Sequence, residues 1–177
     1  MAVTTLEALF VQELSDIYNA ELQLATVLPR LERAAANPVL AQTFKAQMAE
    51  TLLQVERLAS AAAAEGLALL PARCRAMEGW VEEGGEMAEA LERGVVRDAA
   101  LVGMAQKVAH YEIASYGTLC ALAAQLGHRQ ALALLSETLL EEKEADRKLT
   151  VLAKANIPRP ENPEKAMLFR LAELADS

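Results

Sequence analysis

The chain has 177 residues, of which 53% are hydrophobic and only 4% aromatic, and its formal charge is −8 at pH 7. This charge argues against a nucleic-acid partner, because no basic stripe is present to neutralise phosphates. The length predicts one domain with a sizeable core, and no apolar run reaches the roughly 18 residues that a membrane span needs. The N-terminal residues lack the pattern of a secretory signal, and the two cysteines form no motif, so we expect a cytoplasmic protein.

Four long helical patterns fill most of the sequence. Apolar residues recur at intervals of three and four residues over about 5–36, 38–65, 97–126 and 130–155. Asn37 and Pro38 form a helix start, with the asparagine as the cap and the proline in the first turn. Gly66 and Gly127 are natural left-handed terminators. Pro29 lies inside the first pattern, where it predicts a kink or a break.

The connections between these patterns predict the topology. A short loop joins the first and second patterns, and another joins the third and fourth, so each pair should form an antiparallel hairpin. The link of about thirty residues between the hairpins can cross the length of a bundle, as in the ferritin-like variant of the four-helix bundle. Pro71 and several glycines limit this link to short helices, expected near 73–82 and 87–93. The sequence therefore predicts an all-α ferritin-like four-helix bundle over 1–156.

A proline-containing tail follows the bundle at 157–177. It should contain a short helix at about 163–174, with an apolar side formed by Met167, Leu168, Leu171 and Leu174. We expect this helix to pack on the bundle or on another subunit.

Acidic residues interrupt the apolar stripes of the long patterns. The stripe of the fourth pattern is Leu132, Leu135, Leu139, Glu142, Asp146, Leu149 and Ala153. Glu112 takes one position of the third stripe, and Glu13 takes one position of the first, with Asp16 one turn beyond it.

The second pattern allows two stripes. One is flanked by Glu50 and consists of Leu40, Phe44, Gln47, Thr51, Gln54 and Leu58. The other passes through Phe44, Met48, Leu52 and Val55 and moves Glu50 toward the edge of the buried face.

An isolated ionised carboxylate in a low-dielectric interior is so unfavourable that it takes up a proton or finds a partner. Lys143 and Arg147 lie beside the fourth stripe rather than on it, so a divalent cation, or a pair of them, is the partner that we predict. For any single acid, a solvent-facing position or a protonated core carboxyl remains the alternative. His110 is turned about 200° from Glu112 around the helix, so the two cannot face one ion.

Several separated segments resemble the YciE/YciF-type ferritin-like stress proteins. These segments are "LFVQELSDIYNAELQL", "AETLLQVERL", "CRAMEGWVEE", "VAHYEIASYGTL" and "ETLLEEKEADRKL", and the resemblance covers about residues 4 to 155. It implies a bundle like those of ferritin and rubrerythrin, in which each hairpin donates a glutamate from its first helix and an E-x-x-H pair from its second.

Carried over residue by residue, the resemblance places Asp16, Glu50, Glu112 and Glu142 at the four acidic ligand positions. The sequence departs from the E-x-x-H pattern, because Leu53 and Ala145 stand where histidines would be. Gln54 and Asp146, one position further on, offer oxygen instead. A site made almost entirely of oxygen suits iron(II), manganese or magnesium, bound as one or two ions.

The resemblance implies a stress-related protein that handles iron, dioxygen or peroxide, with weak ferroxidase-like or peroxidase-like activity left open. We also expect a homodimer or other homo-oligomer. The alternative is a structural or interaction bundle in which the metal chemistry is degenerate, and a manganese catalase is the third option.

Overall fold

The computed structural model describes residues 3–156, which form five helices and, within that range, no strands. The helices are α1 (Leu6–Ala34), α2 (Pro38–Ala64), α3 (Arg75–Ala90), α4 (Val95–Leu126) and α5 (Arg129–Asn156). No helix in this part of the chain is long and apolar enough to cross a membrane. The tail at 157–177, with its predicted helix at about 163–174, lies outside the described residues.

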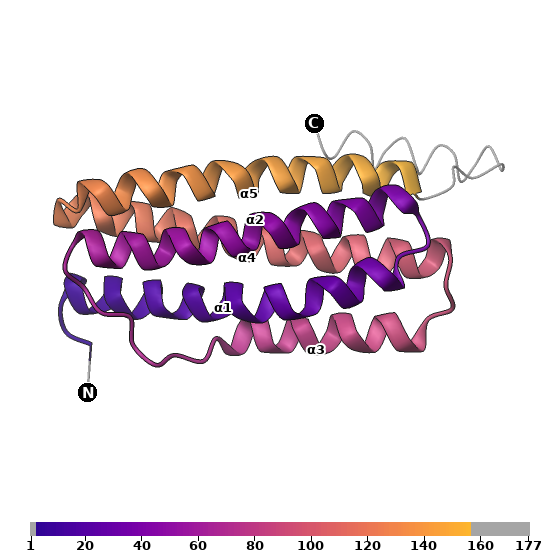
Figure 1. Cartoon of the computed structure of the whole chain (residues 1–177), viewed down its shortest axis with the longest axis horizontal. Helices are drawn as coiled ribbons and strands as arrows, with labels where there is room; N and C mark the ends of the chain where they lie inside the picture. The colour runs from indigo at the N-terminus through magenta and orange to yellow at the C-terminus, as the bar shows by residue number, and fades with distance from the viewer. Residues whose placement is uncertain (1–2, 157–177) are drawn as a thin grey trace, which may run out of the picture.

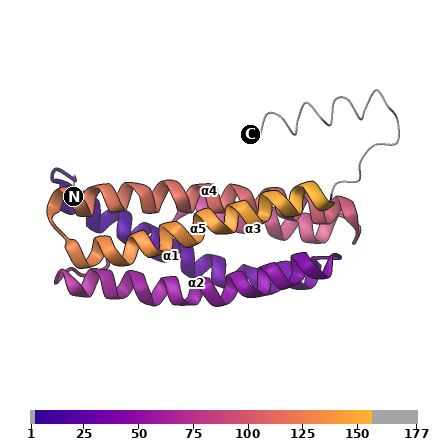
Figure 2. The same ribbon diagram turned by 90° about the horizontal axis from the view of Figure 1, so that it is seen from above.

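The four long helices lie side by side along the long axis, and α3 lies along the outside of the bundle beside α1 (Figure 1). Helices α1 and α2 form one antiparallel hairpin, α4 and α5 form the other, and α2 packs against α5 while α1 packs against α4 (Figures 1 and 2). The segment that contains α3 carries the chain from one end of the bundle to the other. This is the predicted ferritin-like connection.

The helix boundaries follow the capping residues. The Asn37 side chain accepts a hydrogen bond from the Val39 amide at 2.8 Å, and Pro38 occupies the first turn of α2. Gly66 and Gly127 have φ angles of 68° and 78°, which glycine adopts without a steric penalty. The predicted start of α2 and the predicted ends of α2 and α4 are thus confirmed.

Helix α1 continues through Pro29, so of the predicted kink or break the break is wrong, and the kink stays a prediction. A proline inside a helix destabilises it by about 3 kcal/mol because a hydrogen bond is lost. Leu28 and Leu31, on either side of Pro29, are almost completely buried. Burying two leucine side chains stabilises the folded state by roughly 1.5–3 kcal/mol each, which is enough to keep this end of α1 helical.

The crossover contains one helix of 16 residues, α3, rather than the two short helices that its glycines predicted. A Cβ atom on Gly84 would lie 2.9 Å from Met104 Cε, and one on Gly85 would lie 2.7 Å from Arg30 Nη1. Arg30 Nη2 also donates to the Gly85 carbonyl at 3.1 Å. These two glycines therefore serve close packing of α3 on α1 and α4, and this packing compensates for their low helix propensity.

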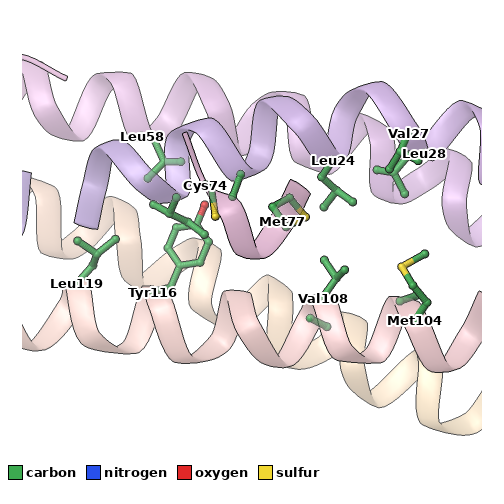
Figure 3. Packing of buried hydrophobic residues seen from close by; sticks show 14 of the residues in the cluster. Leu24, Val27, Leu28, Leu58, Cys74, Met77, Met104, Val108, Tyr116 and Leu119 are labelled. Atoms are coloured by element: carbon green, nitrogen blue, oxygen red, sulfur yellow. The ribbon is translucent and has the colours of Figure 1, made fainter. Parts of the chain in front are cut away.

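The core between the hairpins is apolar over most of its length. Leu24, Val27 and Leu28 of α1 face Met104 and Val108 of α4 (Figure 3). Closer to the opposite end of the bundle, the same layer contains the phenol of Tyr116 near Leu58 and Leu119 (Figure 3). The Tyr116 hydroxyl donates a hydrogen bond to the buried carboxyl group of Glu21.

Candidate metal centre

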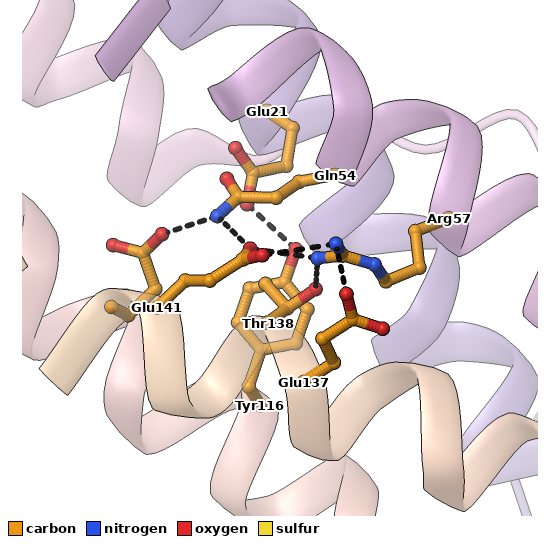
Figure 4. Close-up of polar contacts among 8 residues, drawn as sticks. Glu21, Gln54, Arg57, Tyr116, Glu137, Thr138 and Glu141 are labelled. Carbon is orange, nitrogen blue, oxygen red and sulfur yellow. Dashed lines mark hydrogen bonds and ion pairs between the residues drawn. The ribbon is translucent and has the colours of Figure 1, made fainter. Parts of the chain in front are cut away.

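Glu21 is the acidic residue that α1 contributes to the core. The buried stripe of α1 consists of Phe10, Leu14, Ile17, Glu21, Leu24, Leu28 and Leu31. The Glu21 side chain is completely buried, and its Oε1 accepts a hydrogen bond of 2.7 Å from the Tyr116 hydroxyl (Figure 4). Its Oε2 receives no hydrogen bond from the described residues. One oxygen of this carboxyl group is therefore fixed by α4 and the other is free to bind.

Glu112 lies one turn before Tyr116 on α4 and is also buried. Within residues 3–156, no amide, guanidinium or hydroxyl group donates a hydrogen bond to either of its oxygens, so only neighbouring carboxyl groups can share a proton with it. Its carboxyl group lies next to those of Glu21 and Glu142, whose charges act on it. Three acids from three helices thus meet in the core.

Glu142 and Gln54 complete the inner group. Gln54 Nε2 donates to Glu142 Oε1 at 2.7 Å and also to Glu141 Oε2 at 3.1 Å. Glu142 Oε2 has no hydrogen-bond donor in the described part of the chain. We call Glu21, Gln54, Glu112 and Glu142 the inner cluster. Each of the four long helices contributes one member of it.

The inner cluster retains protons near neutral pH. Burial, with the charge of Glu142, raises the pKa of Glu21 to about 8, although the Tyr116 hydrogen bond acts in the opposite direction. Burial and the charges of Glu142 and Glu21 raise the pKa of Glu112 well above its ordinary value. Burial also raises the pKa of Glu142, against the hydrogen bonds with Glu112 and Gln54. A shared proton is what allows neighbouring buried carboxyl groups to lie together.

An outer group of charged residues covers the inner cluster between α2 and α5 (Figure 4). Arg57 donates to Glu141 through two bonds, from Nη1 at 2.7 Å and from Nη2 at 3.0 Å. It also donates to Thr138 Oγ1 at 2.7 Å and to Glu137 Oε1 at 3.0 Å. The guanidinium is thus bound to the outer acids and neutralises none of the three inner ones. We call Arg57, Glu137, Thr138 and Glu141 the outer network.

The structure brings together three of the predicted site residues, Gln54, Glu112 and Glu142, and it separates others. Asp16 is half-buried and accepts a hydrogen bond from the Tyr111 hydroxyl at 2.9 Å. Asp146 Oδ1 lies 3.1 Å from Nε2 of His110.

The other two predicted acids lie toward the surface. Glu50 is partly exposed and lines a surface hollow, and its charge acts on Glu142. Glu13 is partly exposed on α1, where Leu14 rather than Glu13 lies in the buried stripe.

Sequence reasoning missed Glu21. The predicted stripe ran through Leu6, Glu13 and Ala20, whereas Leu6 is 48% exposed. A stripe that passes through Leu14 instead of Glu13 and continues to Leu28 has a large apolar residue at every step except Glu21. That single interruption is the signal that identifies it.

Within the described residues, no three histidine, cysteine, aspartate or glutamate side chains already have the geometry to hold a metal ion. Five buried carboxyl oxygens of the described residues lack a hydrogen bond, namely four of the inner cluster and Oδ1 of Asp146. The four of the inner cluster nevertheless fit a hard cation, since they are buried and belong to neighbouring carboxyl groups. Binding an ion there requires that the carboxyl groups release protons and turn toward it.

The helices, their connection and the polar layer define the class of protein as a ferritin-like four-helix bundle. The model of the family described as "Domain of unknown function (DUF892)" matches residues 5–160, and the chain belongs to this family. The predicted fold class and the predicted YciE/YciF-type resemblance are both confirmed.

Similar proteins are known from several bacteria. The protein YciF of Escherichia coli (strain K12) is 51% identical over 158 residues, which cover 89% of this chain and 95% of YciF. The crystal structure of YciF, described there as a stress protein, matches with a TM-score of 0.85 at 50% identity, covering 87% of this chain and 98% of that one.

A Rhodopseudomonas palustris structure, named YcfI and described as a candidate structural protein, matches with a TM-score of 0.80 at 40% identity. It covers 84% of this chain and 94% of its own. A Xanthomonas campestris structure shares the fold, with a TM-score of 0.67 at 20% identity over 85% of this chain and 91% of its own.

Proposed function

We propose that the inner cluster binds one or two hard divalent cations, iron(II) or manganese(II) in preference to magnesium. One observation carries this proposal: Oε2 of Glu21, both oxygens of Glu112 and Oε2 of Glu142 are buried, and no described residue outside the inner cluster donates a hydrogen bond to them. A buried acceptor without a donor destabilises the fold by about 1–3 kcal/mol, so four such oxygens in one place favour a cationic partner. Stress-related handling of iron, dioxygen or peroxide in the cytoplasm is the corresponding biological role.

Each neighbouring residue has a task in this function. Tyr116 orients Glu21 by its hydrogen bond, and Gln54 orients Glu142. A flip of the Gln54 amide presents its oxygen in place of its nitrogen, which adds a neutral ligand. When bound, such an ion supplies Lewis-acid or redox chemistry toward dioxygen or peroxide. Glu50, Asp16, Asp146 and, least centrally, Glu13 are proposed as outer acids that attract the cation.

A structural bundle is the second candidate function. Protons alone can neutralise the inner cluster, because the pKa values of its acids are raised. The residue three positions after Gln54 is Arg57, and the residue three after Glu142 is Ala145, so neither offers an imidazole. The Rhodopseudomonas palustris relative is described as a candidate structural protein. In this function the chain acts through its surfaces, as a homodimer.

Metal analysis distinguishes the two functions. The protein is purified without chelators, loaded anaerobically with iron(II) or manganese(II), passed through a desalting column and measured for metal by mass spectrometry. We expect a stoichiometric amount in the wild type. Glu112→Gln combined with Glu142→Gln should lose the metal without unfolding, because each amide retains the shape of a protonated carboxyl but cannot ionise.

The matched control is Glu137→Gln combined with Glu144→Gln, which removes the same charge from exposed positions on α5. This control should retain the metal. If the wild type elutes as empty as the inner double variant, the metal-binding function is wrong and the structural function stands.

A further inference from the structure

A groove of about 410 Å³ runs between the first turns of α2 and the last turns of α5. Val39 and Ala46 of α2 and Ala145 and Leu149 of α5 are among the residues that line it. Val39 is 58% exposed, and Gln42 and Ala46, which follow it on the same side of α2, are exposed as well. Apolar side chains that line an open groove are typical of a binding surface.

The tail of the chain begins next to this groove. Helix α5 ends at Asn156, about two turns beyond Leu149, and residues 157–177 follow. The family model ends at residue 160, and the match to the YciF structure covers 98% of that chain but only 87% of this one. Most of the tail is therefore an addition to the shared bundle, as a segment that binds to the bundle would be.

The tail sequence has the pattern of a short amphipathic helix. Asn162 and Pro163 repeat the start signal of α2, which is formed by Asn37 and Pro38. One face of the predicted helix is apolar and consists of Met167, Leu168, Leu171 and Leu174. A helix with one apolar face needs a surface to cover.

We propose that residues 163–174 of the tail bind as a helix in the groove of their own chain. Twelve residues of helix measure about 18 Å, and the lining residues of α2 from Pro38 to Glu50 extend over about the same length. Residues 157–162 extend up to roughly 20 Å, which allows the chain to turn back at the end of α5. The tail helix then runs parallel to α2, with Pro163 beside Pro38 and Leu171 beside Ala46.

We expect the groove to bind the tail helix of the same molecule rather than that of a second one, because this tail is already attached next to the groove. A short linker gives an attached segment an effective concentration in the millimolar range, which a second molecule does not reach at ordinary protein concentrations. The groove is thus occupied from within the monomer.

Disulfide trapping in the full-length protein tests this placement. The variant carries Ala46→Cys and Leu171→Cys, with Cys120→Ser to remove the native thiol that is not buried. The control carries Glu173→Cys instead of Leu171→Cys, which puts the thiol on the opposite face of the predicted helix. Mild oxidation should form a disulfide within one chain at least ten times faster in the first variant than in the control.

Two results overturn the proposal. Equal rates in both variants mean that the tail does not dock by its apolar face, and disulfides that link two chains mean that a second copy fills the groove. A second measurement uses full-length Leu171→Asp, which should bind several times more of the apolar dye ANS than the wild type, while Ala166→Asp on the opposite face should not. Equal dye binding by all three proteins also overturns the proposal.

Discussion

Glu141 and Glu142 are adjacent in sequence, but they belong to two regions with opposite electrostatics. Burial alone would raise the pKa of Glu141, but the hydrogen bonds and charge of Arg57, with a hydrogen bond from Gln54, lower it. Burial raises the pKa of Glu142, although hydrogen bonds with Glu112 and Gln54 act in the opposite direction. The outer network therefore holds ionised acids with their counter-ion, whereas the inner cluster holds acids that retain protons. The position of one arginine, rather than the residue type, determines which acid is charged.

The largest predicted effect is a loss of stability of the metal-free protein as pH rises. The folded pKa of Glu21 is raised from its ordinary value of 4.5 to about 8, so the folded state binds more protons than the unfolded state in this interval. The free energy of unfolding should therefore fall from pH 5 to pH 8, by about 1.4 kcal/mol per pH unit for each inner acid that holds its proton. Urea denaturation at several pH values measures this slope.

The matched variant replaces Glu21, Glu112 and Glu142 with glutamine, which fixes the neutral form of all three. Its slope over this interval should be close to zero. A wild type whose stability stays constant or rises between pH 5 and pH 8 would show that the inner acids are ionised.

A smaller effect is expected in the outer network, whose contribution to the free energy of unfolding has the opposite pH dependence. Arg57→Met removes the guanidinium from Glu141 and should lower the free energy of unfolding at pH 7 by roughly 2 kcal/mol, the range for hydrogen bonds to charged groups. The lowered pKa of Glu141 stabilises the fold above its ordinary pKa, and this contribution is lost as pH falls. The difference from wild type should thus shrink toward pH 3.

Glu137→Gln serves as the control for this variant, because Glu137 is 61% exposed and makes one bond to Arg57. An exposed pair contributes little, so a change of less than about 1 kcal/mol is expected. If both variants have equal stability, Arg57 does not hold the outer network together.

The smallest effect is expected for Tyr116→Phe, which removes one hydrogen bond to Glu21 and leaves the ring in place. The free energy of unfolding should fall by about 1 kcal/mol. The pKa of Glu21 should rise further, since the phenol hydrogen bond opposes the effect of burial. Carboxyl carbon NMR of the inner acids follows this pKa, and a lower value in the variant would contradict the arrangement.

Local signals predicted most of the fold. The Asn37–Pro38 start and the two terminating glycines act through their own backbone geometry. The helix boundaries that they set could therefore be predicted from the sequence alone. The connection lengths gave the ferritin-like topology for the same reason. Helix α3 was not foreseen as one element, because Gly84 and Gly85 look like helix breakers unless Met104 and Arg30 are known to lie against them.

The candidate site was only partly predictable. Gln54, Glu112 and Glu142 were found, since each interrupts an apolar stripe. Glu21 was missed because the predicted stripe on α1 took Glu13 and Ala20 in place of Leu14 and Glu21, and one residue turns a helix by about 100°. The hydrogen bonds from Arg57 to the acids of α5 depend on how far α2 and α5 are shifted along each other. The apolar pattern of a single helix carries no information about this shift.

The inner cluster has a consequence for the assembly of the bundle itself. If one long helix slid by seven residues, about 10.5 Å, apolar side chains would still meet apolar side chains over much of its length. The polar level, however, would then face hydrocarbon, with Gln54 or Glu142 separated from the partners that they have now. A single polar level in an apolar seam can thus set the alignment of helices, as one buried asparagine does in coiled coils. The side chains of the inner cluster therefore fix how the two hairpins are aligned along their axes, whether or not an ion is bound.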